Sequence, residues 1–196
     1  MFKPYTVHHI ERGVWQIWDA MGVGMTLIAG DERALLFDAG YGLWDIEAAV
    51  SGLTDKPLTV VLSHAHHDHA LGALRLGGQA VQISFADLPF LSVYTASGQR
   101  QRILDASQGK GMQPDDWARQ HYLDTPFPQA VPLESDVFDL VGLRLRVISL
   151  PGHTPGAIGL LGEKSGLLLA AGRGFGSWLT STWSNERASS DLRLCR

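Results

Sequence analysis

A dense histidine cluster is the first feature of this sequence that indicates chemistry. Residues 64–69 read HAHHDH, which holds four of the eight histidines of the 196-residue chain together with Asp68. Imidazole nitrogens and carboxylate oxygens are ligands of zinc and related metals. His64 and His66 follow the apolar run at 58–62, where an extended i, i+2 pair points to the same side. The cluster therefore predicts a metal site at the end of a buried strand, the alternative being a surface run of histidines that binds nothing.

A second histidine site candidate lies downstream, in a turn rich in glycine and proline. Residues 151–156 read PGHTPG and place His153 between two apolar runs. Loops at strand ends are where scaffolds display functional side chains. Alone, His153 would be interpreted as a structural loop residue. Beside the cluster at 64–69, it is interpreted as a third histidine ligand.

Together these two motifs resemble those of the metallo-β-lactamase superfamily. HAHHDH at 64–69 matches its histidine-rich motif, and PGHTPG at 151–156 matches its Pro-Gly-His-Thr turn. LLFDAG at 35–40 is similar to a third family motif, an apolar strand that ends in Asp-x-Gly. The order and spacing agree from about residue 5 to about residue 170. The resemblance implies an α/β fold, an αββα sandwich of two sheets packed face to face with helices outside and the metal site at one edge.

The resemblance also implies which residues bind metal. His64, His66 and His153 match the three ligands of the first metal site. Asp68 and His69 match ligands of the second site.

Two more residues are implied to support these ligands without binding metal. Asp38 matches a position that orients the ligand loop, since carboxylates next to a ligand fix histidine tautomer and direction. The alternative interpretation of Asp38 is a plain turn residue at the end of a strand. Thr154 either contacts the ligand His153 in the same way or only caps the turn.

The family pattern is incomplete at its second metal. Arg173 stands where the family carries a metal-bridging aspartate, and no histidine follows His153. Two ligands are few for a divalent ion, and Arg173 adds a fixed positive charge. The alternatives are a one-metal variant, a degenerate relative, or a tail altered from about residue 172 by frameshift or truncation, which we favour. We expect one zinc ion and an impaired second site, with iron and manganese as alternative metals.

Apolar periodicity predicts the elements that position these residues. We expect a single domain over 1–196 that is incomplete at its C-terminus, with a helical insertion or cap at about 87–130; irregular packing over the core is the alternative for that segment. A further helix is expected to begin at 184–196. Strands are predicted at 13–20, 58–62 and 80–86, and two more within 24–40 around the turn at 30–32. Hairpins are predicted at 136–150 and 157–172, and helices at 43–53, 69–78, 88–107 and 114–121.

Composition narrows the class of protein. Apolar residues make up 45% and charged residues 18% of the chain, which is typical of a globular domain, and the net charge of −4 argues against a nucleic-acid partner. The lone Cys195 forms no internal disulfide. The N-terminal stretch lacks a signal-peptide pattern, and no apolar run reaches the roughly 20 residues of a membrane span. We therefore expect a cytoplasmic protein without a membrane partner. If the final strand is missing, one sheet edge is left open. Because an open edge can pair with a second chain, we expect a homo-oligomer.

The leading functional hypothesis is a metal-dependent hydrolase. A zinc-bound hydroxide would attack the carbonyl of a small-molecule ester, lactone, thioester or amide. Asp68 is the expected catalytic residue, orienting or deprotonating the attacking water. Trp117, His121 and Tyr122 are candidates to contact substrate. One alternative is a catalytically degenerate member of the fold that acts as a binding or scaffold module, and another is an iron redox enzyme.

Overall fold

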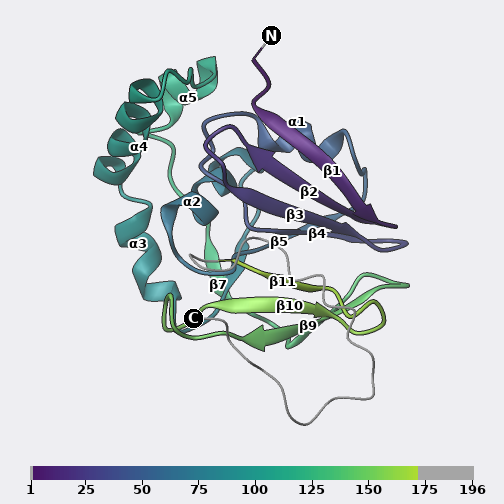
Figure 1. Ribbon diagram of the computed structural model, residues 1–196. Coiled ribbons are helices and arrows are strands. Elements are labelled where there is room, and N and C mark those ends of the chain that lie inside the picture. Colours follow the sequence, from purple (N-terminus) through teal and green to yellow (C-terminus); the bar gives the residue numbers. More distant parts are fainter. Residues whose placement is uncertain (1, 172–196) are drawn as a thin grey trace.

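Two β-sheets form the centre of the protein. The computed structural model describes residues 2–171 of the chain. The larger sheet has seven strands in the order β1-β2-β3-β4-β5-β6-β7, and the smaller has four in the order β11-β10-β9-β8. The two sheets lie face to face, and the helices lie on the far side of the larger one (Figure 1). The predicted α/β sandwich is confirmed over the described residues.

Strands account for most of the predicted elements. All the predicted strands and both predicted hairpins are present, with turns where the glycine signals placed them. The strands are β1 (Tyr5–Glu11), β2 (Val14–Asp19), β3 (Gly24–Ala29), β4 (Ala34–Phe37), β5 (Leu58–Val61), β6 (Val81–Ile83), β7 (Ala130–Pro132), β8 (Val137–Asp139), β9 (Arg144–Ser149), β10 (Ile158–Gly162) and β11 (Leu168–Ala170).

The helices fall where 3.6-residue periodicity predicted them, in shorter pieces. Asp45 caps the first, its carboxylate accepting a hydrogen bond from the Ala48 N–H at 2.9 Å. The helix expected at 184–196 lies outside the described residues. None of the helices within residues 2–171 is long and apolar enough to cross a membrane. The helices are α1 (Ile46–Ser51), α2 (His67–Ala70), the 3₁₀ helix η1 (Leu71–Arg75), the 3₁₀ helix η2 (Leu88–Phe90), α3 (Leu91–Tyr94), α4 (Ser97–Gly109) and α5 (Asp116–His121).

Four neighbouring strands of the larger sheet, β4 to β7, run parallel, and the first three position the residues of the site. β4 pairs with β5, and β5 with β6, all in parallel register. The carboxyl ends of parallel neighbours meet at one edge of a sheet, where open α/β sheets present their sites. Asp38 follows β4, the segment 62–69 follows β5, and Asp87 lies four residues after β6. These three segments must therefore converge.

The space between the two sheets is filled by aliphatic and aromatic side chains. Both faces of β3 and β4 are buried, so these strands are apolar at almost every position rather than alternating. This inner core comprises Val14, Ile28, Leu35, Phe37 and Val61 of the larger sheet and Leu140, Leu145, Ile158, Leu160, Leu167 and Leu169 of the smaller one.

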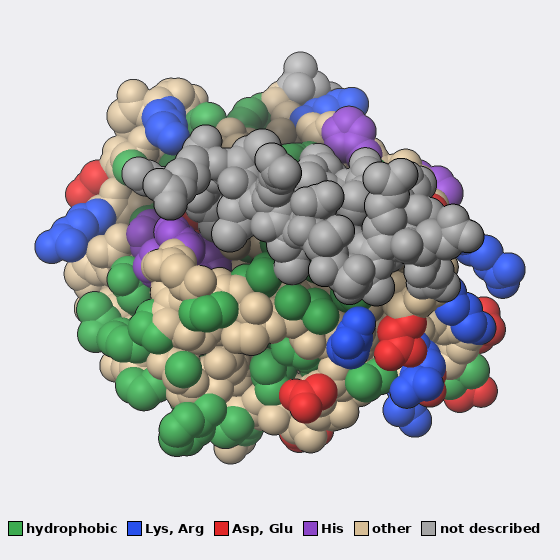
Figure 2. Space-filling model, turned by 60° about the horizontal axis from the view of Figure 1, so that its bottom comes forward, with side chains coloured by type: hydrophobic (Ala, Val, Ile, Leu, Met, Phe, Trp, Pro, Cys, Tyr) green, Lys and Arg blue, Asp and Glu red, His purple; other side chains and the backbone are tan. Residues whose placement is uncertain are grey.

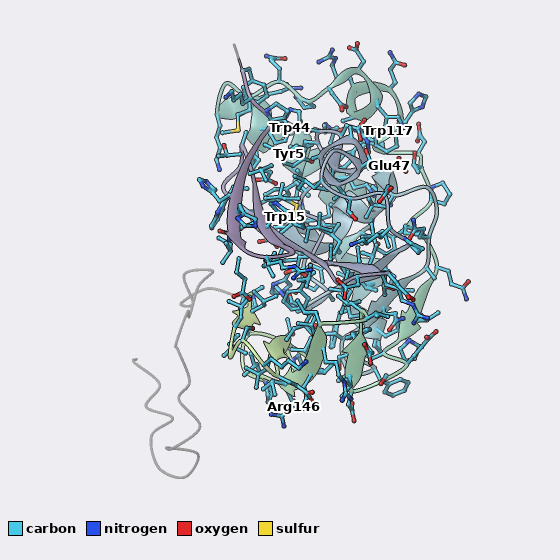
Figure 3. All side chains as sticks on the ribbon, turned by 90° about the vertical axis from the view of Figure 1, so that its right-hand side faces the viewer. Tyr5, Trp15, Trp44, Glu47, Trp117 and Arg146 are labelled. Carbon is cyan, nitrogen blue, oxygen red and sulfur yellow. The ribbon has the colours of Figure 1, made fainter. Side chains whose placement is uncertain are left out.

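A second core lies on the helical side of the larger sheet. Ile46 and Val50 of α1 pack there against Leu36 and Val60 of the sheet. Figure 3 shows Trp44 and Trp117 on this helical side, whereas Arg146 lies at the outer surface of the smaller sheet. The larger sheet is thus the rigid central layer, and its edge carries the loops described next.

Candidate metal centre

Three histidine side chains from two distant segments meet at the edge of the larger sheet. His66 Nδ1 lies 3.1 Å from His64 Nε2 and 2.9 Å from His153 Nε2. The three nitrogens are all within 4.8 Å of one another. His64 is buried, His66 is half-buried and His153 is exposed. The geometry brings together the three residues predicted as first-site ligands, although His66 and His153 are 87 positions apart in sequence.

A second group shares His64 with the first. His64, Asp68 and His69 each offer one atom within 4.8 Å of the others. Asp68 Oδ2 lies 3.6 Å from His69 Nε2. His69 is buried and the Asp68 side chain is about one-third exposed. Both predicted second-site residues therefore face the same space as the histidine triad. Arg173, the residue at the expected bridging position, lies outside the described residues.

Asp38 fixes the direction of two of these imidazoles. Its carboxylate accepts hydrogen bonds from the Ser63 N–H at 2.7 Å and the Ser63 hydroxyl at 2.8 Å, and contacts His69 Nδ1 at 2.8 Å. The Ser63 hydroxyl has one proton, and it donates that proton to the hydrogen bond with Asp38. The Ser63 oxygen therefore accepts a hydrogen bond from His64 Nδ1 at 2.8 Å. His64 and His69 then both carry Nδ1–H, and both Nε2 lone pairs face the site.

Asp38 holds an uncommon backbone conformation to do this. Its φ is +65°, a left-handed value that costs energy for a residue with a side chain. The Asp38 N–H donates to the Val61 carbonyl at 2.9 Å, which ties the strained residue to β5. The residue is 1% exposed, so its carboxylate keeps its hydrogen bonds away from competing water. Its carboxylate thus contacts the segment that carries the predicted ligands, as the orienting role implied by the resemblance would require.

Asp87 is a supporting carboxylate that no sequence motif predicted. It is fully buried and accepts a hydrogen bond from the Ala65 N–H at 2.9 Å. It also accepts from the Thr154 hydroxyl at 2.7 Å and the Gly156 N–H at 2.7 Å. One carboxylate therefore joins the loop of His64 and His66 to the turn of His153. Its only sequence signal is its position shortly after a parallel strand.

The PGHTPG turn is shaped to fit against Asp87. A Cβ atom at Gly156 would lie 2.7 Å from the Asp87 nitrogen and 2.8 Å from its Oδ1, so only glycine allows this approach. Thr154 is buried and gives its hydroxyl proton to Asp87. Thr154 thus supports the turn of His153 through Asp87 rather than by contacting the imidazole.

The environment sets the protonation of the imidazoles. Burial lowers the pKa of His64 to about 4, with the neighbouring His69 acting in the same direction. Burial also lowers the pKa of His66. For His69, burial acts to lower the pKa, but the charge and hydrogen bond of Asp38 outweigh it and raise the pKa. Neutral imidazoles at His64 and His66 are the form that binds metal.

A pocket of about 590 Å³ opens in front of these histidines. His66, His67, Asp68, His69 and His153 line one side of it. Figure 2 shows histidine side chains gathered in one patch at the left of the molecule, with others at its upper right. Tyr41 and Tyr94 line it beside the histidines, and further lining comes from β2, β3 and the turn between them and from the end of β11.

Three residues predicted as substrate contacts lie elsewhere. Trp117 packs under the guanidinium of Arg75, which is 4.3 Å from its ring centroid. His121 contacts Trp117, and Tyr122 is fully buried, donating its hydroxyl proton to the Tyr41 carbonyl. Their aromatic character serves the packing of α4 and α5 on the core. The segment's contribution to the pocket is instead Tyr94, whose ring centroid is 4.5 Å from that of His66.

Comparisons with known proteins agree with this geometry. The family model of the metallo-beta-lactamase superfamily matches residues 19–171. Acyl-coenzyme A thioesterase MBLAC2 of Gallus gallus is 27% identical over 144 residues, which cover 67% of this chain and 50% of the relative. A hydroxyacylglutathione hydrolase of Xylella fastidiosa is 29% identical over 138 residues, 70% of this chain and 40% of that protein. The chain thus spans at most half the length of these two relatives.

Solved structures show the same fold. A metallo-beta-lactamase with a HARLDQ motif from Cronobacter sakazakii superposes with a TM-score of 0.58 at 25% identity. The superposition covers 88% of this chain and 66% of the other.

Proposed function

Because the chain belongs to the metallo-β-lactamase superfamily, we propose that it is a metal-dependent hydrolase that cleaves a thioester of a small-molecule thiol. The observation that carries this proposal is the convergence of His64, His66 and His153 within 4.8 Å at the mouth of a pocket. Both the thioesterase and the hydroxyacylglutathione hydrolase among the relatives act, by their names, on acyl–thiol compounds.

The donor set fits a zinc ion. Three neutral imidazoles together with a water molecule are a known catalytic zinc arrangement. His64 would bind through Nε2, because its Nδ1–H is held by Ser63. His66 would bind through Nδ1 and His153 through Nε2, the atoms that face each other at 2.9 Å. Iron or manganese would suit the same ligands, and Asp68 and His69 would hold part of a second ion.

The chain's own residues would perform the remaining tasks. A bound zinc ion supplies a water molecule of lowered pKa and polarises the carbonyl of the substrate. Asp68 lies within the ligand group and partly open to the pocket, which suits it to orient that water and accept its proton. Asp38 and Asp87 would keep the ligands in place, so that little rearrangement accompanies the reaction.

Hydrolysis of thioester, ester and lactone substrates with and without chelator tests the proposal. We expect the protein to hydrolyse thioesters, and we expect chelator to abolish this turnover and added zinc to restore it. The variant His66→Ala should show no turnover. Exposed His9→Phe, on β1 opposite Trp15, which does not line the pocket, is the control and keeps activity. Stability gained from zinc without turnover of any substrate would contradict the hydrolase and support a binding or scaffold module.

A further inference from the structure

His67 is the one histidine of the HAHHDH stretch that belongs to neither ligand group. It nevertheless lines the pocket, beside the proposed ligand His66. Its ring lies between two tyrosines, with ring centroids 5.8 Å from Tyr41 and 6.3 Å from Tyr94. A half-buried imidazole held between aromatic rings at the mouth of a site has a fixed place from which to contact a ligand.

A chain of hydrogen bonds from α4 determines which nitrogen of His67 carries the proton. Arg102 Nη1 donates to Gln99 Oε1 at 3.3 Å. Arginine is only a donor, so the amide oxygen of Gln99 must face Arg102 and its NH₂ group must face away. That NH₂ lies 3.3 Å from His67 Nδ1, which must therefore accept. The proton of the neutral ring is then on Nε2.

His67 Nε2–H is available to a ligand. None of the hydrogen bonds among residues 2–171 uses this atom. His67 is half-buried, and its Nε2 is not among the buried side-chain atoms without a partner in that part of the chain. Because His67 lines the pocket, its donor is accessible from the side where substrate would bind.

The charge of the pocket indicates which kind of acceptor would suit this donor. No lysine or arginine lines the pocket among the described residues, whereas Asp38 and Asp68 do. A carboxylate or phosphate oxygen at His67 would meet these acidic groups with no side-chain cation of the described lining to pair with, and the proposed zinc is taken up by the acyl carbonyl and the attacking water. An uncharged carbonyl oxygen, such as that of an amide, avoids the repulsion. The flanking rings of Tyr41 and Tyr94 favour a flat or apolar group next to it.

We propose that His67 is a specificity-determining residue that donates a hydrogen bond from Nε2 to an amide carbonyl in the thiol arm of the substrate, with Gln99 as the positioning residue that sets its tautomer. The substrate class is therefore a thioester whose thiol carries a neutral amide near the sulfur. This inference rests on the proposed function for the reaction, but the binding it predicts needs no turnover.

Equilibrium binding of two uncleavable thioethers tests the inference. One is the S-butyl thioether of N-acetylcysteamine, and the other has a plain alkyl arm of the same length. In the zinc-loaded wild-type protein we expect the amide thioether to bind about fivefold more tightly, the usual worth of one hydrogen bond. His67→Phe keeps a ring between the tyrosines but removes the donor, so the preference should disappear. Gln99→Leu should reduce it.

Two controls separate this role from a structural one. Zinc content and thermal unfolding of His67→Phe and Gln99→Leu should equal those of the wild type, because neither residue belongs to the ligand groups. His9→Phe changes an exposed histidine on β1 that pairs with Trp15 rather than with a pocket residue, and it should keep the full preference. Absence of any preference in the wild type, or an undiminished preference in His67→Phe, would overturn the inference.

Turnover is measured separately with the acetyl thioester of N-acetylcysteamine. We expect His67→Phe to raise KM about fivefold with kcat little changed, as for a contact made equally in the ground and transition states. A wild-type protein that binds the amide thioether selectively but hydrolyses no thioester would contradict the proposed function while supporting the role of His67.

Discussion

Asp87 illustrates what a motif can and cannot reveal at the scale of single residues. The histidines and Asp68 were predictable because their types are rare and their spacing is distinctive. Asp87 is an ordinary residue type at an unremarkable position, and only the folded chain shows that it joins the Ala65 and Gly156 backbones. The tautomer of His67 also depends on Gln99, which is 32 positions away.

Replacing Asp87 with Asn should weaken metal binding. The amide group keeps the shape of the carboxylate but has one acceptor oxygen instead of two. In the wild type one oxygen accepts from Ala65 and Thr154 and the other from Gly156, so the variant loses one of these two sets of hydrogen bonds. We expect zinc affinity to fall by about 10- to 100-fold, as when other groups that support a ligand are removed. Competition with a chromophoric chelator measures this. Asp105→Asn, on the exposed side of α4, is the control; equal affinities in all three proteins would argue against the role of Asp87.

Asp19 should give the stability of the protein a pH dependence. Burial raises the pKa of Asp19 to about 6, and this outweighs the backbone hydrogen bonds to its carboxylate, that of Val23 first, which lower it. The folded state therefore binds this proton more tightly than the unfolded state, whose ordinary value is 3.8. The resulting stability is present below the unfolded pKa and is lost as the pH rises through about 6.

Asp19→Asn should remove this dependence. The variant stays neutral, so its free energy of unfolding relative to wild type should rise by on the order of 1 kcal/mol between about pH 4 and pH 8. Urea unfolding of the metal-free proteins at both pH values measures it. A difference between the two proteins that is the same at both pH values would refute the account of Asp19.

At the scale of elements, the buried strands and glycine-marked hairpins were predictable, whereas β1 and β7 were not. β1 reads YTVHHIE and is mostly exposed, because it is an edge strand paired only with β2. β7 has three residues and gains its strand conformation from pairing with β6. Neither carries an apolar period of its own, so tertiary pairing decided their structure.

The close approach of η1 to the loop after β4 is a constraint at this scale. A Cβ atom at Gly72 would lie 1.8 Å from the Ala39 carbonyl oxygen, next to Asp38. Gly72→Ala should therefore destabilise the fold by about 1–3 kcal/mol, the usual cost of overpacking, and should also weaken metal binding by displacing Asp38. Gly98→Ala in α4 is the matched control, since nothing lies within 4 Å of its added Cβ. Chemical unfolding of both variants measures the effect. Equal free energies of unfolding for the two variants would show that the loop after β4 moves to accommodate the added methyl group without cost.

At the scale of the whole molecule, one rigid layer places segments distant in sequence around one pocket. The parallel strands β4, β5 and β6 deliver Asp38, the HAHHDH stretch and Asp87 to one edge, and the β9–β10 connection brings His153 to meet them. Family resemblance made this convergence predictable. The residues that we propose to distinguish substrates are positioned by the helices beside it, by Tyr94 of α3 and Gln99 of α4, whose contacts no pattern in the sequence encodes.

Zinc binding to wild type and His153→Ala tests the central claim most directly, because His153 joins the site from the far end of the chain. We expect the wild-type protein to bind about one zinc ion tightly per chain, using His64, His66 and His153. His153→Ala should lose at least about 100-fold in affinity while keeping its fold by circular dichroism. A wild-type protein that holds no zinc, or a variant that binds it as tightly as the wild type, would contradict the three-histidine metal site.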